Sequence, residues 1–460
     1  MKGFSKALLI GAALGIMVFG TIGCMNQSES GSDDVLKVGT IGFASTLEPT
    51  ADYFSWVVVR YGIGETLVKF DDSMQVKPWL ATSWKQGGDD KLTWTFTIND
   101  KVKFSNGNRL TAEAVKASLE RTFKKSNRAK TFFNYTEITA KGQELTIKTD
   151  KPYYNLPNLL GDPLFLIIDV TAEEQGGRDI SKDGPIATGP YEVESFTKER
   201  AVLKRNENYW DGKAGFSRVE VPAINDANTR AMALQSGDVD MAVNIGPGEY
   251  ETFKNDKNFT VYETASLRDL MVRMSQKGGA LKSANLRSAL ISAAPREEYA
   301  KTLMKGGTFT PGGKAPLPPS VDYGFNQLRD PNAYNVERAK ELLARDGYRD
   351  TNGGDGIVDK DGGENLVLTL YTYASRPELP LYAEALQADY KKIGIDVQIK
   401  IMDYTVVDSI AQSGDYDMIL SSIVTSNTGG QPVWFLKQYW GGPAVKITVR
   451  DFPMHDLMNS

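Results

Sequence analysis

Residues 366–401 read LVLTLYTYASRPELPLYAEALQADYKKIGIDVQIKI, and this stretch decides the fold. Leu366–Tyr373 has the length and the β-branched and aromatic content of a strand, and Glu378–Ile393 is long enough to form a helix that Gly394 ends. Every second residue of the next segment is apolar, which predicts a half-buried strand: Ile395, Val397, Ile399 and Ile401. Strand, helix and strand imply a right-handed crossover between parallel strands. The chain is therefore expected to have an α/β fold.

The loop 374–377 follows the first of these strands. Ligands of open α/β sheets bind beyond the carboxyl ends of the strands, so Arg376 in this loop is expected to face a ligand. The alternative is an exposed loop arginine that pairs with Glu378. Both interpretations of Arg376 remain open at the level of the sequence.

The same alternation of strand and helix recurs along the chain. Residues 35–41 and 92–98 have strand patterns, and the second alternates apolar with polar residues. Thr111 is placed to cap a helix whose apolar residues recur every four positions, and Asp226 begins another helix that stops near Gly237. Because no motif repeats at a fixed period, these elements indicate α/β domains and not a repeat protein.

The first residues have the features of a lipoprotein leader. Lys2 and Lys6 precede an uncharged apolar run, Ala7–Gly20, and the small Gly23 stands directly before Cys24. Residues 1–23 are therefore expected to be a cleaved signal peptide, with Cys24 lipidated and residues 24–34 forming a polar, flexible tether. The alternative is a buried thiol within a short membrane anchor. No later stretch approaches the roughly 20 apolar residues of a membrane helix, so lipid alone is expected to hold the body on the extracytoplasmic face of the membrane.

Length and composition limit the function. A chain of 460 residues exceeds the size of one core, so at least two domains are expected, and one Cys leaves no disulfide. The formal net charge is -5 and basic residues are scattered, which does not favour nucleic acid as a partner. His455 is the only histidine, so a Ser-His-Asp triad or a histidine-ligated zinc site lacks material. The chain is not expected to be an enzyme or to need a cofactor.

One Gly-rich loop could suit calcium because five polar side chains punctuate it: Asp350, Asn352, Asp355, Asp359 and Asp361. An extra glycine breaks the spacing of an EF-hand loop, however, and the terminal Glu is missing. A solvated turn is the better interpretation, and no metal site is predicted.

Seven segments resemble, in order, the landmarks of one known family. They are 78–84 (PWLATSW), 94–107 (WTFTINDKVKFSNG), 110–115 (LTAEAV), 188–191 (TGPY), 205–210 (RNENYW), 233–240 (ALQSGDVD) and 413–417 (SGDYD). Each segment alone could be core or turn, but their joint order resembles the bacterial extracellular solute-binding proteins, family 5, of peptide, dipeptide and nickel ABC importers.

The resemblance implies a two-lobed periplasmic-binding-protein-like fold of type II. Its larger lobe would comprise residues 35–268 with an inserted subdomain, and its smaller lobe residues 269–442. A protein of this family closes its lobes around a small solute and presents the closed form to an ABC permease. A monomer that delivers its ligand to such a permease is therefore expected.

The segment 371–380 is similar to the nickel-importing members, in which arginine and aromatic side chains grip a small nickel chelate, such as a metallophore or histidine complex, through its carboxylates. The ligand-binding residues that this resemblance implies are Arg376, Tyr373, Arg128, Phe132, Phe133 and Asn427.

Two departures from the nickel-type pattern keep a peptide transporter as the alternative. Asp162 stands where some nickel-type members have an arginine, and residues 424–432 lack their Trp-Gly segment. Peptide-binding members provide an acidic residue for the ligand's amino terminus, and Asp162 could serve in that way or simply cap a turn before Pro163. Residues 443–460 form an atypical tail, and the sequence there is expected to be truncated relative to the family.

Overall fold

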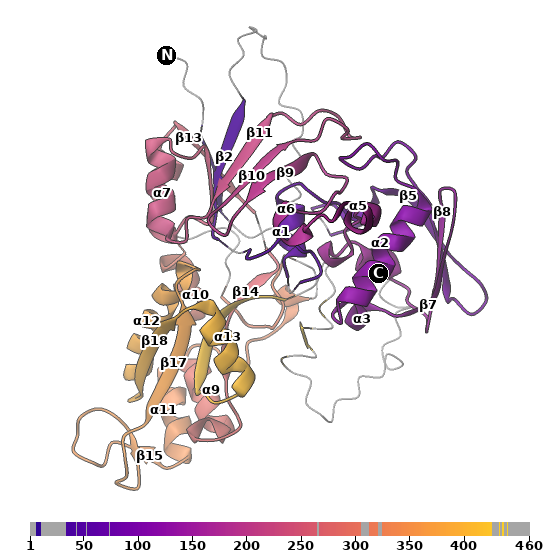
Figure 1. The fold of residues 1–460 in the computed structure, drawn as a ribbon. Coiled ribbons are helices and arrows are strands. Elements are labelled where there is room, and N and C mark those ends of the chain that lie inside the picture. The colour runs from indigo at the N-terminus through magenta and orange to yellow at the C-terminus, as the bar shows by residue number, and fades with distance from the viewer. Residues whose placement is uncertain are drawn as a thin grey trace.

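The computed structural model of the chain describes residues 6–10, 34–42, 44–51, 53–72, 74–264, 266–304, 312–320, 324–425, 432, 435–436 and 439. These residues form two lobes of mixed helix and sheet, joined between β13 and β14, as Figure 1 shows. The expected two-lobed α/β fold is confirmed. Cys24, Asn427, His455 and the tail 443–460 lie outside the described residues.

Lobe I is built on a sheet with the strand order β13-β1-β12-β2-β11-β10-β9. Its strands are β1 (Lys6–Ile10), β2 (Val35–Gly39), β9 (Tyr191–Phe196), β10 (Arg200–Arg205), β11 (Arg218–Pro222), β12 (Met241–Val243) and β13 (Phe259–Glu263). Strand β1 pairs in parallel with β12 and β13, and it comes from the segment expected to be the leader, whose cleavage stays a prediction. Helices α1 (Ser55–Arg60), α7 (Ala227–Ser236) and α8 (Pro247–Asn255) accompany this sheet.

A second sheet of lobe I has the order β5-β6-β8-β7 and packs against α2 (Ala112–Lys125). Its strands are β5 (Ala81–Gly87), β6 (Thr93–Ile98), β7 (Tyr135–Lys141) and β8 (Glu144–Thr149). Thr111 caps α2 as expected, because its side chain accepts a hydrogen bond from the Ala114 N–H. The apolar face of α2 meets the alternating face of β6 in one core, which contains Trp94, Phe96, Ile98, Val115, Leu119 and Phe123.

Shorter elements complete lobe I. They are β3 (Val68–Phe70), β4 (Val76–Pro78), α3 (Ala129–Phe132), α4 (Leu156–Leu160), η1 (Pro163–Phe165), α5 (Val170–Gly176) and α6 (Ile180–Asp183). Asp226 caps α7 through the Thr229 N–H, and Gly237 ends that helix in a left-handed conformation with φ of 84°, as its sequence predicts.

Lobe II has one sheet with the order β14-β19-β17-β18, formed by β14 (Arg268–Met274), β17 (Val367–Tyr373), β18 (Asp396–Met402) and β19 (Met418–Val424). Strands β17 and β18 are parallel and joined by α12 (Glu378–Lys391), so the predicted crossover is confirmed. One detail was wrong. Ile401 is 50% exposed, because β18 is the edge strand and no described element covers its far end.

The remaining elements of lobe II are helices around this sheet and one small hairpin. They are η2 (Ala280–Lys282), α9 (Ala284–Ala293), α10 (Arg296–Thr302), η3 (Phe325–Gln327), α11 (Val336–Arg345), β15 (Tyr348–Arg349), β16 (Asp359–Lys360) and α13 (Tyr404–Ser413). Among the helices that the structure describes, none is long and apolar enough to cross a membrane.

Candidate ligand-binding cleft

A cleft of about 4000 Å³ lies between the two lobes, and we call it the interlobe cleft. Lobe I contributes the face of α1 and the loops after β11 and β12, and lobe II contributes β14, the end of β19 and the loop after β17. Pockets for small ligands usually measure about 300–1,000 Å³. The lobes must therefore approach one another before a small solute could be enclosed.

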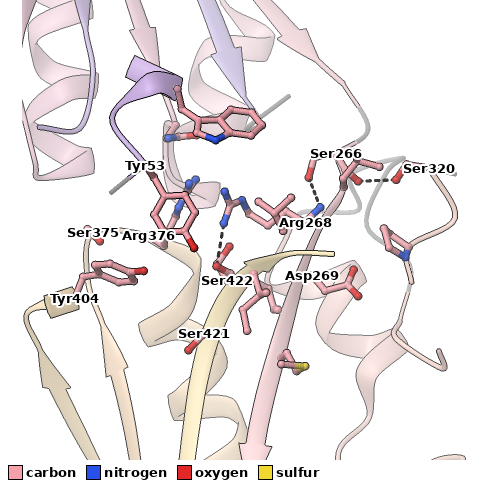
Figure 2. Close-up of a pocket in the computed structure, with 18 of the residues that line it drawn as sticks. Tyr53, Ser266, Arg268, Asp269, Ser320, Ser375, Arg376, Tyr404, Ser421 and Ser422 are labelled. Atoms are coloured by element: carbon pink, nitrogen blue, oxygen red, sulfur yellow. Dashed lines mark hydrogen bonds between the residues drawn. The ribbon is translucent and has the colours of Figure 1, made fainter. Parts of the chain in front are cut away.

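Arg268 is held at the lobe II wall of this cleft by its neighbours. Its Nη1 donates a hydrogen bond to the Ser422 carbonyl at 2.9 Å, and its backbone N–H donates to Ser266 Oγ at 3.0 Å (Figure 2). Ser320 Oγ in turn donates to the Ser266 carbonyl at 2.6 Å. The Nε atom of Arg268 is buried and has no hydrogen-bond partner among the described residues. One side of the guanidinium is thus fixed, and donor capacity is left for a ligand.

Arg376 lies in the loop between β17 and α12, as the crossover argument predicts, and it lines the same cleft. Figure 2 shows its side chain and that of Arg268 in the same part of the cleft. Within the described residues, no carboxylate lies at ion-pair distance from Arg268 or Arg376. The pairing of Arg376 with Glu378, the alternative left open by the sequence, is therefore absent from this structure.

The cationic groups of the cleft perturb one another. Burial and the nearby charges of Arg376 and Arg60 together lower the pKa of Arg268 to about 9, against the opposing effect of Tyr373 and Glu378. Burial and then the charge of Arg376 also lower the pKa of Arg60. Several positive charges thus lie near one another in the cleft without an ion pair to a described carboxylate, an arrangement that attracts anions.

A fourth arginine supports the floor of the cleft. Arg230 is fully buried, and its guanidinium donates only to backbone carbonyls, those of Ile224, Asn225, Val243 and Asn244, at 2.5–3.0 Å. These carbonyls belong to the loop that follows β11, to the last residue of β12 and to the loop that follows β12. Arg230 thus fixes the two lobe I loops that border the cleft, and it adds a buried positive charge beneath them.

Aromatic side chains stand beside the arginines. Tyr373 is 4% exposed, and its hydroxyl accepts a hydrogen bond from the Ser422 N–H at 3.1 Å. Its ring meets that of Tyr404 edge to face, with centroids 5.2 Å apart. Across the cleft, the guanidinium of Arg128 lies 4.6 Å from the ring centre of Tyr53. Two of its nitrogens, Nε and Nη2, are buried and lack a partner among the described residues.

The structure places most of the sequence-predicted site residues at the cleft, but they lie on different lobes. Arg376 and Tyr373 line it from lobe II, and Arg128 and Phe132 line it from lobe I. Phe133 was wrong as a ligand contact: it is fully buried in the lobe I core, with its ring centre 5.0 Å from that of Phe123. Asn427 and Cys24 lie outside the described residues.

Asp162 and the Gly-rich loop have structural roles. Asp162 is 2% exposed and caps η1 by accepting a hydrogen bond from the Leu164 N–H at 2.9 Å. In the loop 350–361, Asp350 accepts from the N–H groups of Gly354 and Gly356, and Asp359 accepts from Thr351. Over the part of the chain that the structure describes, no cluster of three or more His, Cys, Asp and Glu side chains could hold a metal ion.

Sequence reasoning missed Arg60 and Arg268. Nothing near either residue distinguishes it among the 53 Lys and Arg residues of the chain, since Arg60 simply ends an apolar helix and Arg268 begins a strand. It also missed Asp269, a half-buried carboxyl that lines the cleft and whose pKa is raised to about 7 by desolvation.

The sequence from residue 75 to residue 446 matches the family of bacterial extracellular solute-binding proteins, family 5 Middle. The chain is 29% identical over 441 residues to the nickel-binding protein NikA of Staphylococcus aureus, covering 95% of this chain and 83% of NikA. It is 28% identical over 356 residues to the oligopeptide-binding protein AppA of Bacillus subtilis, covering 74% of this chain and 64% of AppA.

The comparison with solved structures also finds solute-binding proteins of ABC importers. The complex of S. aureus NikA with Ni(L-His)2 superimposes with a TM-score of 0.74 at 28% identity, covering 88% of this chain and 81% of NikA. A nickel ABC transporter structure from Bacillus halodurans gives 0.62 at 31% identity, covering 88% of this chain and 82% of that one. The chain belongs to the bacterial extracellular solute-binding proteins, family 5, and it is a solute-binding protein of an ABC importer.

Proposed function

We propose that the protein is an extracellular lipoprotein that captures nickel as a small chelate and delivers it to the permease of its importer. The observation that carries this proposal is the pair Arg268 and Arg376, two cleft arginines without a carboxylate partner among the described residues. Guanidinium groups bind carboxylates through paired, charge-assisted hydrogen bonds. A nickel chelate with carboxylate groups fits such a site, and the similarity to NikA supports this choice of cargo.

In this proposal the protein holds the chelator, and the chelator holds the metal. That division agrees with the absence of a metal-ligand cluster from the described residues and with one histidine in the chain. Tyr373 and Arg128 would add aromatic and cationic contacts from the two lobes when these approach one another.

Replacing Arg376 with alanine is expected to weaken binding of nickel–histidine by about 1.5–3 kcal/mol, because a hydrogen bond to a charged group is lost. This corresponds to roughly tenfold or more in affinity. Isothermal titration calorimetry with nickel and free histidine measures it, and thermal unfolding checks that the variant is folded.

Isothermal titration calorimetry also distinguishes a nickel-binding protein from a peptide-binding protein. The similarity to AppA and the width of the cleft favour peptides as the second candidate. Tight binding of short peptides, with no heat from nickel and histidine, would replace the nickel proposal by the peptide one.

Lipid attachment at Cys24 gives a separate prediction. Cys24→Ser should release the protein from the membrane or leave the leader uncut, because no other cysteine can take the lipid. Cell fractionation followed by immunoblotting measures the membrane-bound share. If the variant stays in the membrane fraction at its mature size, the lipoprotein assignment fails.

A further inference from the structure

We propose that Arg60 of lobe I opposes Arg268 and Arg376 of lobe II across the interlobe cleft, so that the lobes close only on a ligand that presents a carboxylate to each of them. The inference deepens the proposed function and rests on it for the nickel–histidine probe. It assigns a specificity role to Arg60 and a ligand class, compact molecules with two carboxylates, whether or not they carry a metal.

Arg60 is presented to the cleft by α1. It is the last residue of that helix, where a positive charge is favoured by the helix dipole, and its guanidinium carbon lies 5.8 Å from the ring centre of Trp56. The side chain is accessible to solvent at the wall of the cleft, although the surrounding protein partly desolvates its charge, and no described carboxylate pairs with it. Arg60 therefore stands on lobe I as a cation without a counter-ion.

The opposing wall carries two more cations. Arg268 begins β14 and Arg376 follows β17, so both move with the sheet of lobe II. All three arginines line the same cleft, and Figure 2 shows Arg268 and Arg376 in the same part of it. In agreement with this placement, the charge of Arg376 lowers the pKa of both Arg60 and Arg268. The positive groups thus come from both sides of the joint between the lobes.

Nearby carboxylates do not cancel this charge. Glu378 is close enough to raise the pKa of Arg268 and Arg230, but it forms no ion pair with either of them among the described contacts. Asp226 uses Oδ1 to cap α7 through the N–H and hydroxyl of Thr229. Asp269 also lines the cleft, but burial raises its pKa to about 7, and it forms no ion pair with the arginines among the described contacts.

Like charges repel more strongly as they approach. Repulsion between Arg60 and the lobe II pair, Arg268 and Arg376, therefore resists closure of the empty cleft. A ligand with one carboxylate would neutralise positive charge on one lobe and leave the positive charge of the other lobe without a partner. Two carboxylates would bridge the walls, turn repulsion into attraction and shift the population to the closed form. The unliganded protein is held open by the same charges that bind the ligand.

The first test compares three ligands by small-angle X-ray scattering of the purified protein. Nickel with L-histidine should reduce the radius of gyration, and nickel with L-histidinamide should not, because histidinamide keeps the amine and imidazole but lacks the carboxylate. Glutathione, which has two carboxylates and needs no metal, provides the metal-free arm. Equal contraction with the histidine and histidinamide chelates would overturn the inference. It would also be overturned if neither nickel–histidine nor glutathione contracted the protein.

The second test changes Arg60. The first test identifies a ligand that contracts the wild type. Arg60→Gln should lower the affinity for that ligand by about tenfold or more. The radius of the unliganded variant should depend less on salt between about 0.02 and 0.5 M, because screening has less repulsion to remove. Arg60→Lys should keep the salt dependence and lose part of the affinity. Arg345→Gln, at an exposed arginine on α11, is the matched control.

The outcomes keep the two proposals apart. Contraction with glutathione that requires Arg60, together with no response to nickel–histidine, would refute the nickel cargo and support the two-carboxylate requirement. An Arg60→Gln variant that binds and closes like the wild type would refute the requirement even if nickel–histidine binds tightly.

Discussion

Replacing Arg268 and Arg376 together with glutamine is expected to lower the affinity for nickel–histidine on the order of 100-fold or more. Each arginine offers a charge-assisted hydrogen bond worth about 1.5–3 kcal/mol, and neighbouring losses do not add fully, which leaves about 3 kcal/mol or more. Glutamine keeps a donor and much of the side-chain length. The loss would therefore report the charge and the planar fork, and not a collapsed cleft.

The control for this double variant is a second pair of arginines. Arg329 and Arg345 are exposed and lie outside the lining of the cleft, so replacing both with glutamine changes the net charge equally. Calorimetry should give wild-type affinity for the control, and thermal unfolding should show both variants folded. Equal weakening in the two variants would mean that overall charge attracts the ligand and that no specific site exists at Arg268 and Arg376.

Arg376 could be predicted from the sequence because its evidence is local. A strand of seven residues, a short loop and a helix followed by Gly394 all lie within 36 consecutive positions, and sheet topology assigns the loop to the ligand side. Arg60 and Arg268 could not be predicted in this way. They are separated from Arg376 by more than a hundred residues each, and only the pairing of β14 with β19 and the docking of the lobes bring them to one cleft.

The error at Phe133 has a local physical cause. Helix α3 ends at Phe132, and Phe133 is already extended, with φ of -156° and ψ of 168°. Both rings contact Phe165, but after the backbone changes from helical to extended Phe133 is fully buried in the core, while Phe132 stays half-buried and lines the cleft. The sequence shows two adjacent aromatic residues and does not show that a helix ends between them.

The largest effect on stability is expected from disrupting a buried ion network in lobe I. Arg121 of α2 is bidentate to two carboxylates: it donates to Glu48 at 2.7 and 3.1 Å and to Glu173 of α5 at 2.5 and 2.9 Å. Its side chain is only 8% exposed, and those of Glu48 and Glu173 are 18% and 25% exposed. The network ties α2 to α5 and to the segment that follows β2.

Arg121→Met is expected to destabilise the protein by about 3–5 kcal/mol at pH 7, because it leaves two largely buried carboxylates without their main partner. Urea unfolding followed by circular dichroism measures the free energy of the transition. The control is Lys340→Met, which breaks the exposed ion pair with Glu337 and should cost about 1 kcal/mol or less. Similar losses in the two variants would show that burial does not strengthen the network.

The difference between wild type and Arg121→Met should also depend on pH. Hydrogen bonds from Arg121 hold the pKa of Glu173 at about 2, and at Glu48 the bonds from Arg121 and Thr50 outweigh burial, so that its pKa is lowered as well. A carboxyl with a lowered folded pKa contributes stability that is complete above its unfolded pKa, about 4.3, and is lost as the pH falls through the folded value. The wild type should therefore lose its advantage over the variant progressively between about pH 4.5 and pH 2. An advantage that persists unchanged at pH 2.5 would mean that Arg121 stabilises lobe I through the packing of its side chain and not through its charge.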